Sequence, residues 1–260
     1  MTGILLVQST VAALVGLVFG SFVTVLIHRV PRKESILAPR SRCPSCGTTI
    51  RARENIPVVS YLLLGGRCRN CRARISPKYP LVELASAALW VGALLRFQDQ
   101  LYIAAVMALF FTTLLAISVI DAEHRIVPNR IVYPALPGFA VLVLAGGLLG
   151  QLDTVRGALG LLVYGGGLLL VALAYPRGMG IGDVKLAALI GLVLGSLGLS
   201  YVTVAAAAGF FAGGLGGVVA LATGRSRKTA IPFGPYLAAG AVFSALAGAP
   251  VAAWYLSKLR

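Results

Sequence analysis

The sequence predicts an all-α polytopic membrane protein with about eight transmembrane helices. The 260 residues are 58% hydrophobic and only 12% charged, whereas soluble domains are about 25% charged. Several long stretches contain no Asp, Glu, Lys or Arg, and the basic residues gather between alternate stretches. This composition excludes an ordinary soluble domain, and it also excludes a disordered chain, which would be poor in apolar residues.

Seven stretches without a charged residue define the expected spans. A membrane-spanning helix needs about 20 apolar residues, so the longest stretch is expected to hold two helices that turn near Gly195-Ser196-Leu197-Gly198. The shortest stretch reaches sufficient length only if its helix begins near Leu81 and carries Glu83 close to its end. The stretches are 1–28, 84–95, 100–120, 131–152, 157–176, 186–224 and 229–257.

The distribution of Lys and Arg predicts the orientation, because cytoplasmic loops carry an excess of basic residues. An external N-terminus places 19 of the 23 basic residues in cytoplasmic segments, namely 28–80, 121–130, 177–185 and 225–228. Eight spans then return the C-terminus to the outside. The first stretch lacks the basic start of a cleavable signal peptide, so we expect a retained helix. The formal net charge of +15 thus reflects orientation, and no nucleic-acid partner is expected.

The segment 28–80 holds all four cysteines, as Cys43-Pro-Ser-Cys46 and Cys68-Arg-Asn-Cys71. This spacing is typical of a four-cysteine zinc site. Disulfides are the alternative, but the predicted cytoplasmic location is reducing and favours zinc. Four thiolates leave no coordination position for water, so the zinc is expected to be structural. Nearby arginines offset the charge of the thiolates or contact anionic membrane lipid.

This composition divides the chain into three parts. Residues 1–27 form the first transmembrane helix, residues 28–80 form the cytoplasmic zinc-binding segment, and residues 81–260 form a seven-helix membrane domain.

Two aspartates are the candidate catalytic residues. Asp121 ends the third predicted span and Asp183 begins the sixth, and ionisable groups at a membrane boundary are costly unless they serve a function. Two carboxylates that approach each other share a proton, so one can activate water while the other protonates a carbonyl. Gly180 and Gly182 lack side chains and would let a peptide backbone approach. This is the chemistry of an aspartic peptidase.

Other interpretations of these residues remain open. Lys185 either favours the ionised form of Asp183 or serves as an ordinary positive anchor at the membrane. Glu83 either pairs with Lys78 or Lys185 or has a functional part. A polytopic transporter, or a non-catalytic membrane assembly factor that uses the zinc knuckle to bind a partner, would also fit the composition.

Five motifs occur in a fixed order along nearly the whole chain. They are Gly20-Ser21-Phe22 with 25–31, the cysteine segment from Cys43 through 54–57 to Glu83, Asp121 with Val127-Pro128-Asn129, Gly178-Met-Gly-Ile-Gly-Asp183-Val-Lys185, and Ile231-Pro-Phe-Gly-Pro235. In these motifs the chain resembles the type IV prepilin peptidases, bifunctional leader peptidases and N-methyltransferases of the GxGD type. The sequence departs from the family at Thr24, where Asn is usual.

The resemblance implies an enzyme of the bacterial inner membrane whose catalytic site faces the cytoplasm. Its substrates would be prepilins or pseudopilins of type IV pilus and type II secretion systems, which have a basic leader before a hydrophobic helix. Asp121 and Asp183 match the catalytic aspartates of the family. After cleavage, S-adenosylmethionine would methylate the new N-terminal amine, and Glu83 could orient or deprotonate that amine.

Overall fold

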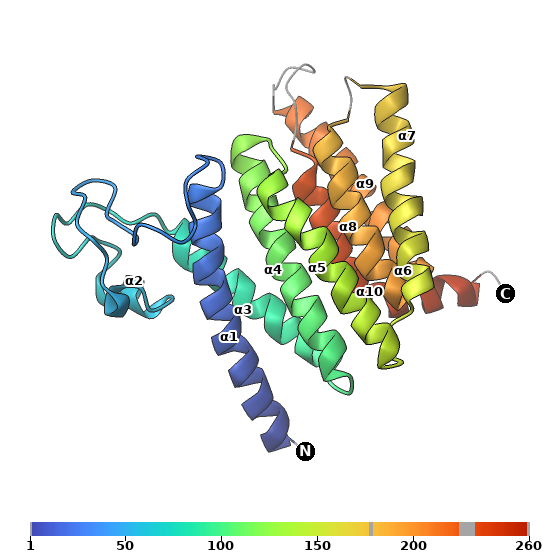
Figure 1. Cartoon of the computed structure of the whole chain (residues 1–260), viewed down its shortest axis with the longest axis horizontal. Helices are drawn as coiled ribbons and strands as arrows, with labels where there is room; N and C mark the ends of the chain where they lie inside the picture. The colour runs from blue at the N-terminus through green and yellow to red at the C-terminus, as the bar shows by residue number, and fades with distance from the viewer. Residues whose placement is uncertain (1, 177–178, 224–231, 259–260) are drawn as a thin grey trace. The chain divides into compact units, whose positions relative to one another are not determined.

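The computed structural model describes residues 2–176, 179–223 and 232–258, and its side-chain environments extend to residue 248 (Figure 1). Within this part of the chain the regular structure is helical, apart from isolated β-bridges Arg42–Thr49 and Arg67–Arg74. The chain divides into two compact units, Met1–Gln98 and Asp99–Arg260. The all-α prediction is confirmed. The three-part division at residues 27 and 80 concerns location in the membrane and stays a prediction.

The N-terminal unit consists of two long helices and the cysteine segment between them. Its elements are α1 (Thr2–Arg29), η1 (Ala52–Glu54), α2 (Val59–Leu63) and α3 (Lys78–Arg96). Helix α1 approaches α3 closely at two glycines. A Cβ atom on Gly16 would lie 2.7 Å from Cα of Ala87, and one on Gly20 would lie 2.7 Å from Cα of Glu83. Small residues at four-residue spacing permit this packing inside a membrane.

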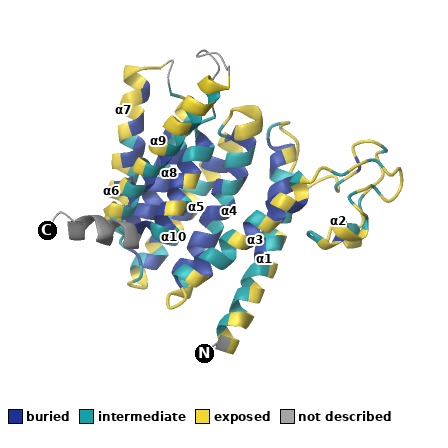
Figure 2. Ribbon diagram, turned by 180° about the vertical axis from the view of Figure 1, so that it is seen from behind, coloured by how far each residue is buried: buried dark blue, intermediate teal, exposed yellow. Residues whose placement is uncertain are grey.

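The C-terminal unit is a bundle with α4 and α8 at its centre (Figure 2). Phe110 and Phe111 of α4 and Ile190 and Leu194 of α8 are completely buried. The elements are α4 (Leu101–His124), α5 (Asn129–Leu148), α6 (Thr154–Gly160), the π-helical turn η2 (Leu161–Gly165), α7 (Gly166–Ala174), α8 (Ile181–Leu197), α9 (Leu199–Ala222) and α10 (Gly234–Lys258).

The helices match the predicted spans one for one, because α6, η2 and α7 follow each other directly as a single stretch. Among the described residues, six helices have the length and apolar composition to cross a membrane, while α8 and the part Gly234–Gly248 of α10 are shorter. Helix α8 ends at Leu197, and Gly198 has a φ of 147°, so the predicted turn is confirmed. Helix α3 begins at Lys78, three residues before the predicted start.

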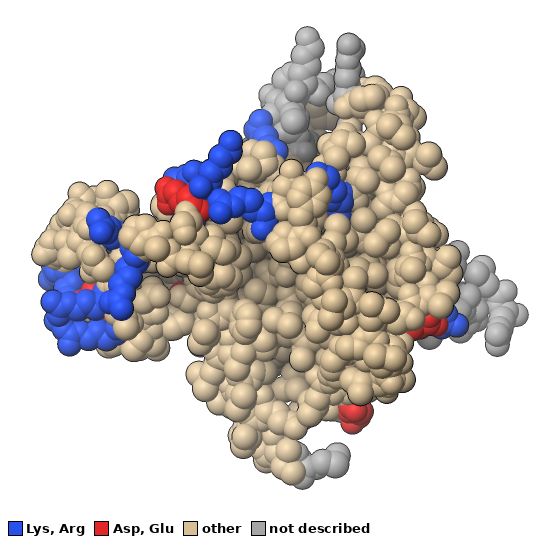
Figure 3. All heavy atoms as spheres, viewed as in Figure 1, with Lys and Arg blue, Asp and Glu red and all other residues tan. Residues whose placement is uncertain are grey.

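The sides of the described helices carry few charged side chains. Figure 3 shows Lys and Arg on the cysteine segment and at one end of the helices, whereas large areas of the helical surface in that view carry no charge. Many large apolar side chains are exposed on α1, α5, α7 and α9, such as Leu14, Val141, Leu170 and Phe211. Such surfaces are stable only in contact with lipid or with other protein.

Candidate functional site

The four cysteine sulfur atoms converge in the N-terminal unit. They all lie within 4.8 Å of one another, and the sulfur atoms of Cys43 and Cys71 are 3.8 Å apart. In a tetrahedral site with zinc–sulfur bonds of about 2.3 Å, the sulfur atoms are separated by about 3.8 Å. None of the four cysteines forms a disulfide. The predicted ligands Cys43, Cys46, Cys68 and Cys71 are therefore brought together in a cluster that could hold a metal ion.

The two cysteine pairs have the same local fold. In the first, the amide of Gly47 donates to the carbonyl of Cys43, and Gly47 has a φ of 69°. In the second, the amide of Arg72 donates to the carbonyl of Cys68, and Arg72 has a φ of 59°. A β-bridge flanks each pair. In both pairs the residue after the second cysteine is left-handed and closes the turn.

The surroundings of the cysteines shift the pKa values of two thiols in opposite directions. The hydroxyl and backbone of Thr48 and the side chain of Asn70 lower the pKa of Cys46 to about 6. The backbone amide of Ala73 acts to lower the pKa of Cys71, but desolvation and the neighbouring thiols outweigh it and raise that pKa to about 11. Four thiolates this close repel one another, so the fully deprotonated cluster requires a cation.

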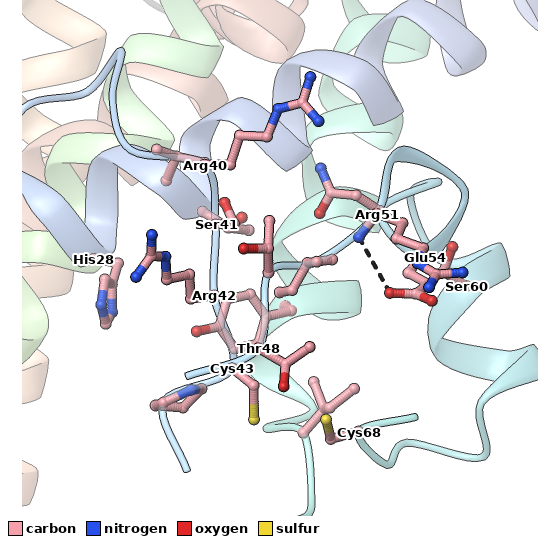
Figure 4. A pocket seen from close by; sticks show the side chains of 18 of the residues that line it. His28, Arg40, Ser41, Arg42, Cys43, Thr48, Arg51, Glu54, Ser60 and Cys68 are labelled. Atoms are coloured by element: carbon pink, nitrogen blue, oxygen red, sulfur yellow. Dashed lines mark hydrogen bonds between the residues drawn. The ribbon is translucent and has the colours of Figure 1, made fainter. Parts of the chain in front are cut away.

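A cavity of about 1100 Å³ opens between the end of α1, the cysteine segment and the start of α3 (Figure 4). Its lining mixes carboxylates, basic groups and apolar side chains, including Glu34, Glu54, Arg42 and Ile56. Thr24 also lines it and donates from its hydroxyl to the Ser21 carbonyl at 2.7 Å. The volume slightly exceeds the range typical of small-molecule sites, about 300–1,000 Å³.

Glu83 is a buried carboxylate in the wall of this cavity, with 7% of its surface exposed. Its Oε2 accepts a 2.7 Å hydrogen bond from the backbone amide of Val58, and the Ser21 side chain is a further partner. Val58 has a φ of 61° and closes a three-residue turn in which the Val59 amide donates to the Pro57 carbonyl. Such a turn is strained for a β-branched residue, and Glu83 contributes to holding it.

Asp121 lies in the last turn of α4 and is 4% exposed. Its Oδ2 accepts a 2.9 Å hydrogen bond from the backbone amide of Gly234, the first residue of α10. The N-terminus of a helix presents unpaired amides and partial positive charge. The start of α10 therefore stabilises and orients this carboxylate.

Asp183 is half-buried in the first turn of α8, three residues after the N-cap residue Gly180. Its carboxylate takes a hydrogen bond from the Gly180 backbone, and the negative charge of Asp121 acts on it. The two aspartates are 62 positions apart in the sequence, yet they lie close enough for the charge of one to act on the other. Each carboxylate rests at the N-terminus of a different helix.

The two glycines before Asp183 have different surroundings. A Cβ atom on Gly182 would lie 2.8 Å from Cβ of Val127, in the connection between α4 and α5. Gly180 is exposed, and its added Cβ would meet the Asp183 carboxylate at 3.5 Å. Gly182 therefore admits a neighbouring segment of the same chain. The expected role of Gly180 in admitting a substrate backbone stays a prediction. Gly178 lies outside the described residues.

Lys185 is directed to α5. Its Nζ donates to Oδ1 of Asn129 at 3.0 Å and to the hydroxyl of Tyr133 at 2.8 Å, and it lies 4.5 Å from the centre of the Tyr133 ring. Neither of the two interpretations of Lys185 from the sequence included these partners. Glu83 accepts a hydrogen bond from Val58, and Lys185 binds α5. The pairing of Glu83 with Lys78 or Lys185 stays a prediction.

Three groups around the aspartates were not expected from the sequence: the Gly234 amide, the Val127 side chain and the Asn129–Tyr133 pair. The flanking prolines of Pro232-Phe233-Gly234-Pro235 signal a helix start, and this signal could have identified Gly234. Ile231 of the same motif lies outside the described residues. Nothing in the local sequence marks Tyr133.

Comparison with known proteins gives matches along most of the chain. Residues 14–97 match the Bacterial Peptidase A24 N-terminal domain, and residues 108–218 match the Type IV leader peptidase family. The first match lies within the N-terminal unit and the second within the C-terminal unit.

Several relatives carry the name Prepilin leader peptidase/N-methyltransferase. The protein of Burkholderia pseudomallei (strain K96243) is 37% identical, over 94% of this chain and 86% of the relative. That of Bacillus subtilis (strain 168) is 37% identical, over 93% and 95%. That of Pseudomonas aeruginosa (PAO1) is 36% identical, over 94% and 91%. No solved structure matches the chain. The chain is therefore a multi-pass inner-membrane enzyme that belongs to the type IV leader peptidase family.

Proposed function

We propose that this enzyme cleaves the leader peptide from prepilin-like substrates with Asp121 and Asp183 as its catalytic carboxylates. The observation that carries the proposal is that two aspartates at separate helix ends lie close enough for the charge of one to act on the other. The hydrogen bond from Gly234 fixes the first carboxylate and the Gly180 backbone fixes the second. Aspartate dyads catalyse peptide hydrolysis when the pair holds one proton.

The reaction follows from that shared proton. The ionised aspartate takes a proton from water while the water oxygen attacks the carbonyl carbon of the scissile peptide. The protonated aspartate gives its proton to the carbonyl oxygen, which forms a tetrahedral diol. When the carbon–nitrogen bond breaks, the first aspartate protonates the leaving amine and the second recovers a proton from the diol. The pair thus returns to its starting state.

The substrate chemistry is what membership of the type IV leader peptidase family implies. The bond to be cleaved would follow a glycine at the boundary between a basic leader and a hydrophobic helix. In the proposed orientation both termini lie outside and the aspartates face the cytoplasm, because 19 of the 23 basic residues then lie inside. The enzyme is itself strongly basic and does not attract a basic leader. Substrate capture therefore depends mainly on the hydrophobic helix of the substrate.

The test uses purified enzyme in lipid vesicles with a prepilin substrate. Asp121→Asn and Asp183→Asn should each abolish cleavage, because neither amide can exchange the required proton. Asp99→Asn is the matched control, since Asp99 is an exposed residue in the loop before α4 and its replacement should leave activity intact. A transporter or a non-catalytic assembly factor would not cleave the substrate, and full activity in either dyad variant would refute the proposal.

A second activity, N-methylation of the new terminus, is favoured by the cavity in the N-terminal unit. We propose that this cavity binds S-adenosylmethionine, since its volume is about 1100 Å³ and its lining offers both signs of charge to a zwitterionic ligand. Glu83 would accept the proton from the substrate ammonium group. The free amine would then attack the methyl carbon, and the carbon–sulfur bond would break to release S-adenosylhomocysteine.

The proposed role of Glu83 is tested by Glu83→Gln. The amide oxygen can still accept from the Val58 amide, so the local turn is preserved while the base is lost. Mass spectrometry of the product should show a cleaved but unmethylated N-terminus. Glu123→Gln is the control, because Glu123 is exposed on the other unit. Wild-type methylation in Glu83→Gln would exclude Glu83 as the base.

The metal of the cysteine cluster is proposed to be zinc with a structural role. The 3.8 Å separation of the Cys43 and Cys71 sulfur atoms supports tetrahedral coordination. Such a metal would fix the two cysteine turns and, through them, one wall of the cavity, which both Cys43 and Cys68 line.

A further inference from the structure

The start of α8 is joined to the start of α5 by a three-residue cluster, here called the Lys185 clamp, which consists of Lys185, Asn129 and Tyr133. The Lys185 ammonium donates to both partners, at 3.0 Å and 2.8 Å, and also lies over the Tyr133 ring at 4.5 Å. The Lys185 ammonium group is thus held by three contacts, two hydrogen bonds and one cation–π contact. The clamp therefore restricts movement between the two helix ends.

The connection between α4 and α5 is short and is held at several points. Arg125 adopts a φ of 56°, and its amide donates to the Asp121 carbonyl at 2.8 Å. Val127 packs against Gly182 at the start of α8. Pro128 accepts hydrogen bonds from the first turn of α5. The segment 125–128 thus links Asp121 firmly to Asn129.

A continuous series of contacts therefore connects the two catalytic candidates. Asp183 lies two residues before Lys185 in α8, and Asp121 connects through the turn to Asn129. The ammonium of Lys185 is directed to Asn129 and Tyr133 of α5. The charged group of Lys185 thus connects α8 to α5.

We infer that Lys185 is a positioning residue, which sets the separation of Asp121 and Asp183 through Asn129 and Tyr133. This inference rests on the proposed peptidase function of the dyad. Its consequence is that removal of either clamp partner should impair the chemical step although the charge of Lys185 remains in place. A misplacement of about 1 Å can reduce the rate about a hundredfold.

The kinetic test compares Lys185→Met, Asn129→Ala and Tyr133→Phe on a prepilin substrate in vesicles. Each should lower kcat at least about threefold, with Lys185→Met losing the most, and leave KM unchanged, because the clamp acts on the dyad. The triple variant should lose no more than Lys185→Met alone, since the three groups act as one unit. Lys185→Arg should recover part of the rate, because a guanidinium can also donate to Asn129 and stack on Tyr133.

A second measurement does not depend on activity. Hydrogen exchange followed by mass spectrometry should show faster exchange over 125–133 in the three clamp variants. Tyr175→Phe is the control, since Tyr175 is exposed at the end of α7, and its variant should match the wild type in both assays. The pH profile should keep its shape in Asn129→Ala and Tyr133→Phe.

The outcomes separate this inference from the proposed function. If Asp121→Asn is inactive while Asn129→Ala and Tyr133→Phe keep full kcat, the clamp is wrong and the dyad stands. If Asp121→Asn is active, the dyad fails, and the exchange data then decide the clamp alone: unchanged exchange over 125–133 overturns it. A loss in Lys185→Met that shifts the pH profile and that neither partner variant reproduces would show direct action on Asp183.

Discussion

The backbone amide of Gly234 donates a 2.9 Å hydrogen bond to Oδ2 of Asp121 across 113 positions of sequence. Because Gly234 is the first residue of α10, the carboxylate lies against an unpaired helix terminus, where a negative charge is favoured. A Cβ atom on Gly234 would lie 2.8 Å from that same oxygen. The absence of a side chain is therefore what permits the hydrogen bond.

Gly234→Ala should reduce kcat for leader cleavage about ten- to a hundredfold. The three atoms nearest to the added methyl group all belong to the Asp121 side chain, so the helices can keep their positions while Asp121 turns away from the amide. Cleavage in vesicles and the helical circular dichroism spectrum together measure this effect.

Gly214→Ala provides the comparison. Gly214 is in α9, and a Cβ atom there would have nothing within 4 Å, so cleavage should remain at the wild-type rate. Equal activities of the two alanine variants would show that the Gly234–Asp121 contact has no part in catalysis.

Gly182→Ala should also impair cleavage, for a different reason. Its Cβ would lie 2.8 Å from Cβ of Val127, which cannot rotate away, so the connection between α4 and α5 must shift. Val127→Gly removes the opposing atom, and the double variant Gly182→Ala/Val127→Gly should recover part of the lost kcat.

The recovery is the informative result, because loss alone would also follow if Gly182 admitted the substrate backbone. A double variant as impaired as Gly182→Ala would favour that substrate role. Steady-state cleavage of one prepilin by the three variants is sufficient to decide.

The sequence predicted most of the fold because a membrane imposes simple requirements. Helices must be about 20 apolar residues long, and charge-free stretches show where they lie. The least regular stretch, 84–95, still forms a helix that begins at Lys78. The cysteine spacing likewise predicted the cluster, because a Cys-x-x-Cys pair is a local turn.

The sequence did not reveal the contacts between distant helices. Asp121 and Asp183 were identified from their positions at predicted span ends, but their neighbours depend on how the helices pack. The Lys185 side chain illustrates this: its sequence neighbour is Asp183, whereas its ammonium group binds Asn129 and Tyr133. Sequence distance could not distinguish these alternatives.

Arg72→Gly should strengthen metal retention by the cysteine cluster. Arg72 has a φ of 59°, and Gly47 occupies the equivalent place in the first turn with a φ of 69°. A left-handed conformation costs a non-glycine residue about 1–2 kcal/mol, so the variant should hold its metal about fivefold more tightly in competition with a chelator. Gly47→Ala should weaken retention by a similar factor, and no change in either variant would contradict the expected strain.

The purified protein should contain about one zinc per chain, as expected for a single four-cysteine site. Cys43→Ser/Cys46→Ser should lose it, because two thiolate ligands are removed. Elemental analysis after extensive dialysis measures the ratio. A metal-free wild-type protein with free thiols, or a different metal at equal occupancy, would contradict the zinc assignment.

The most direct test of the account is mass spectrometry of the substrate N-terminus after incubation with the wild type, Asp121→Asn or Asp183→Asn. The dyad predicts a new N-terminus with the wild type and intact prepilin with both asparagine variants, whose helical content should be unchanged. Cleavage at the wild-type rate by either variant would contradict the central claim.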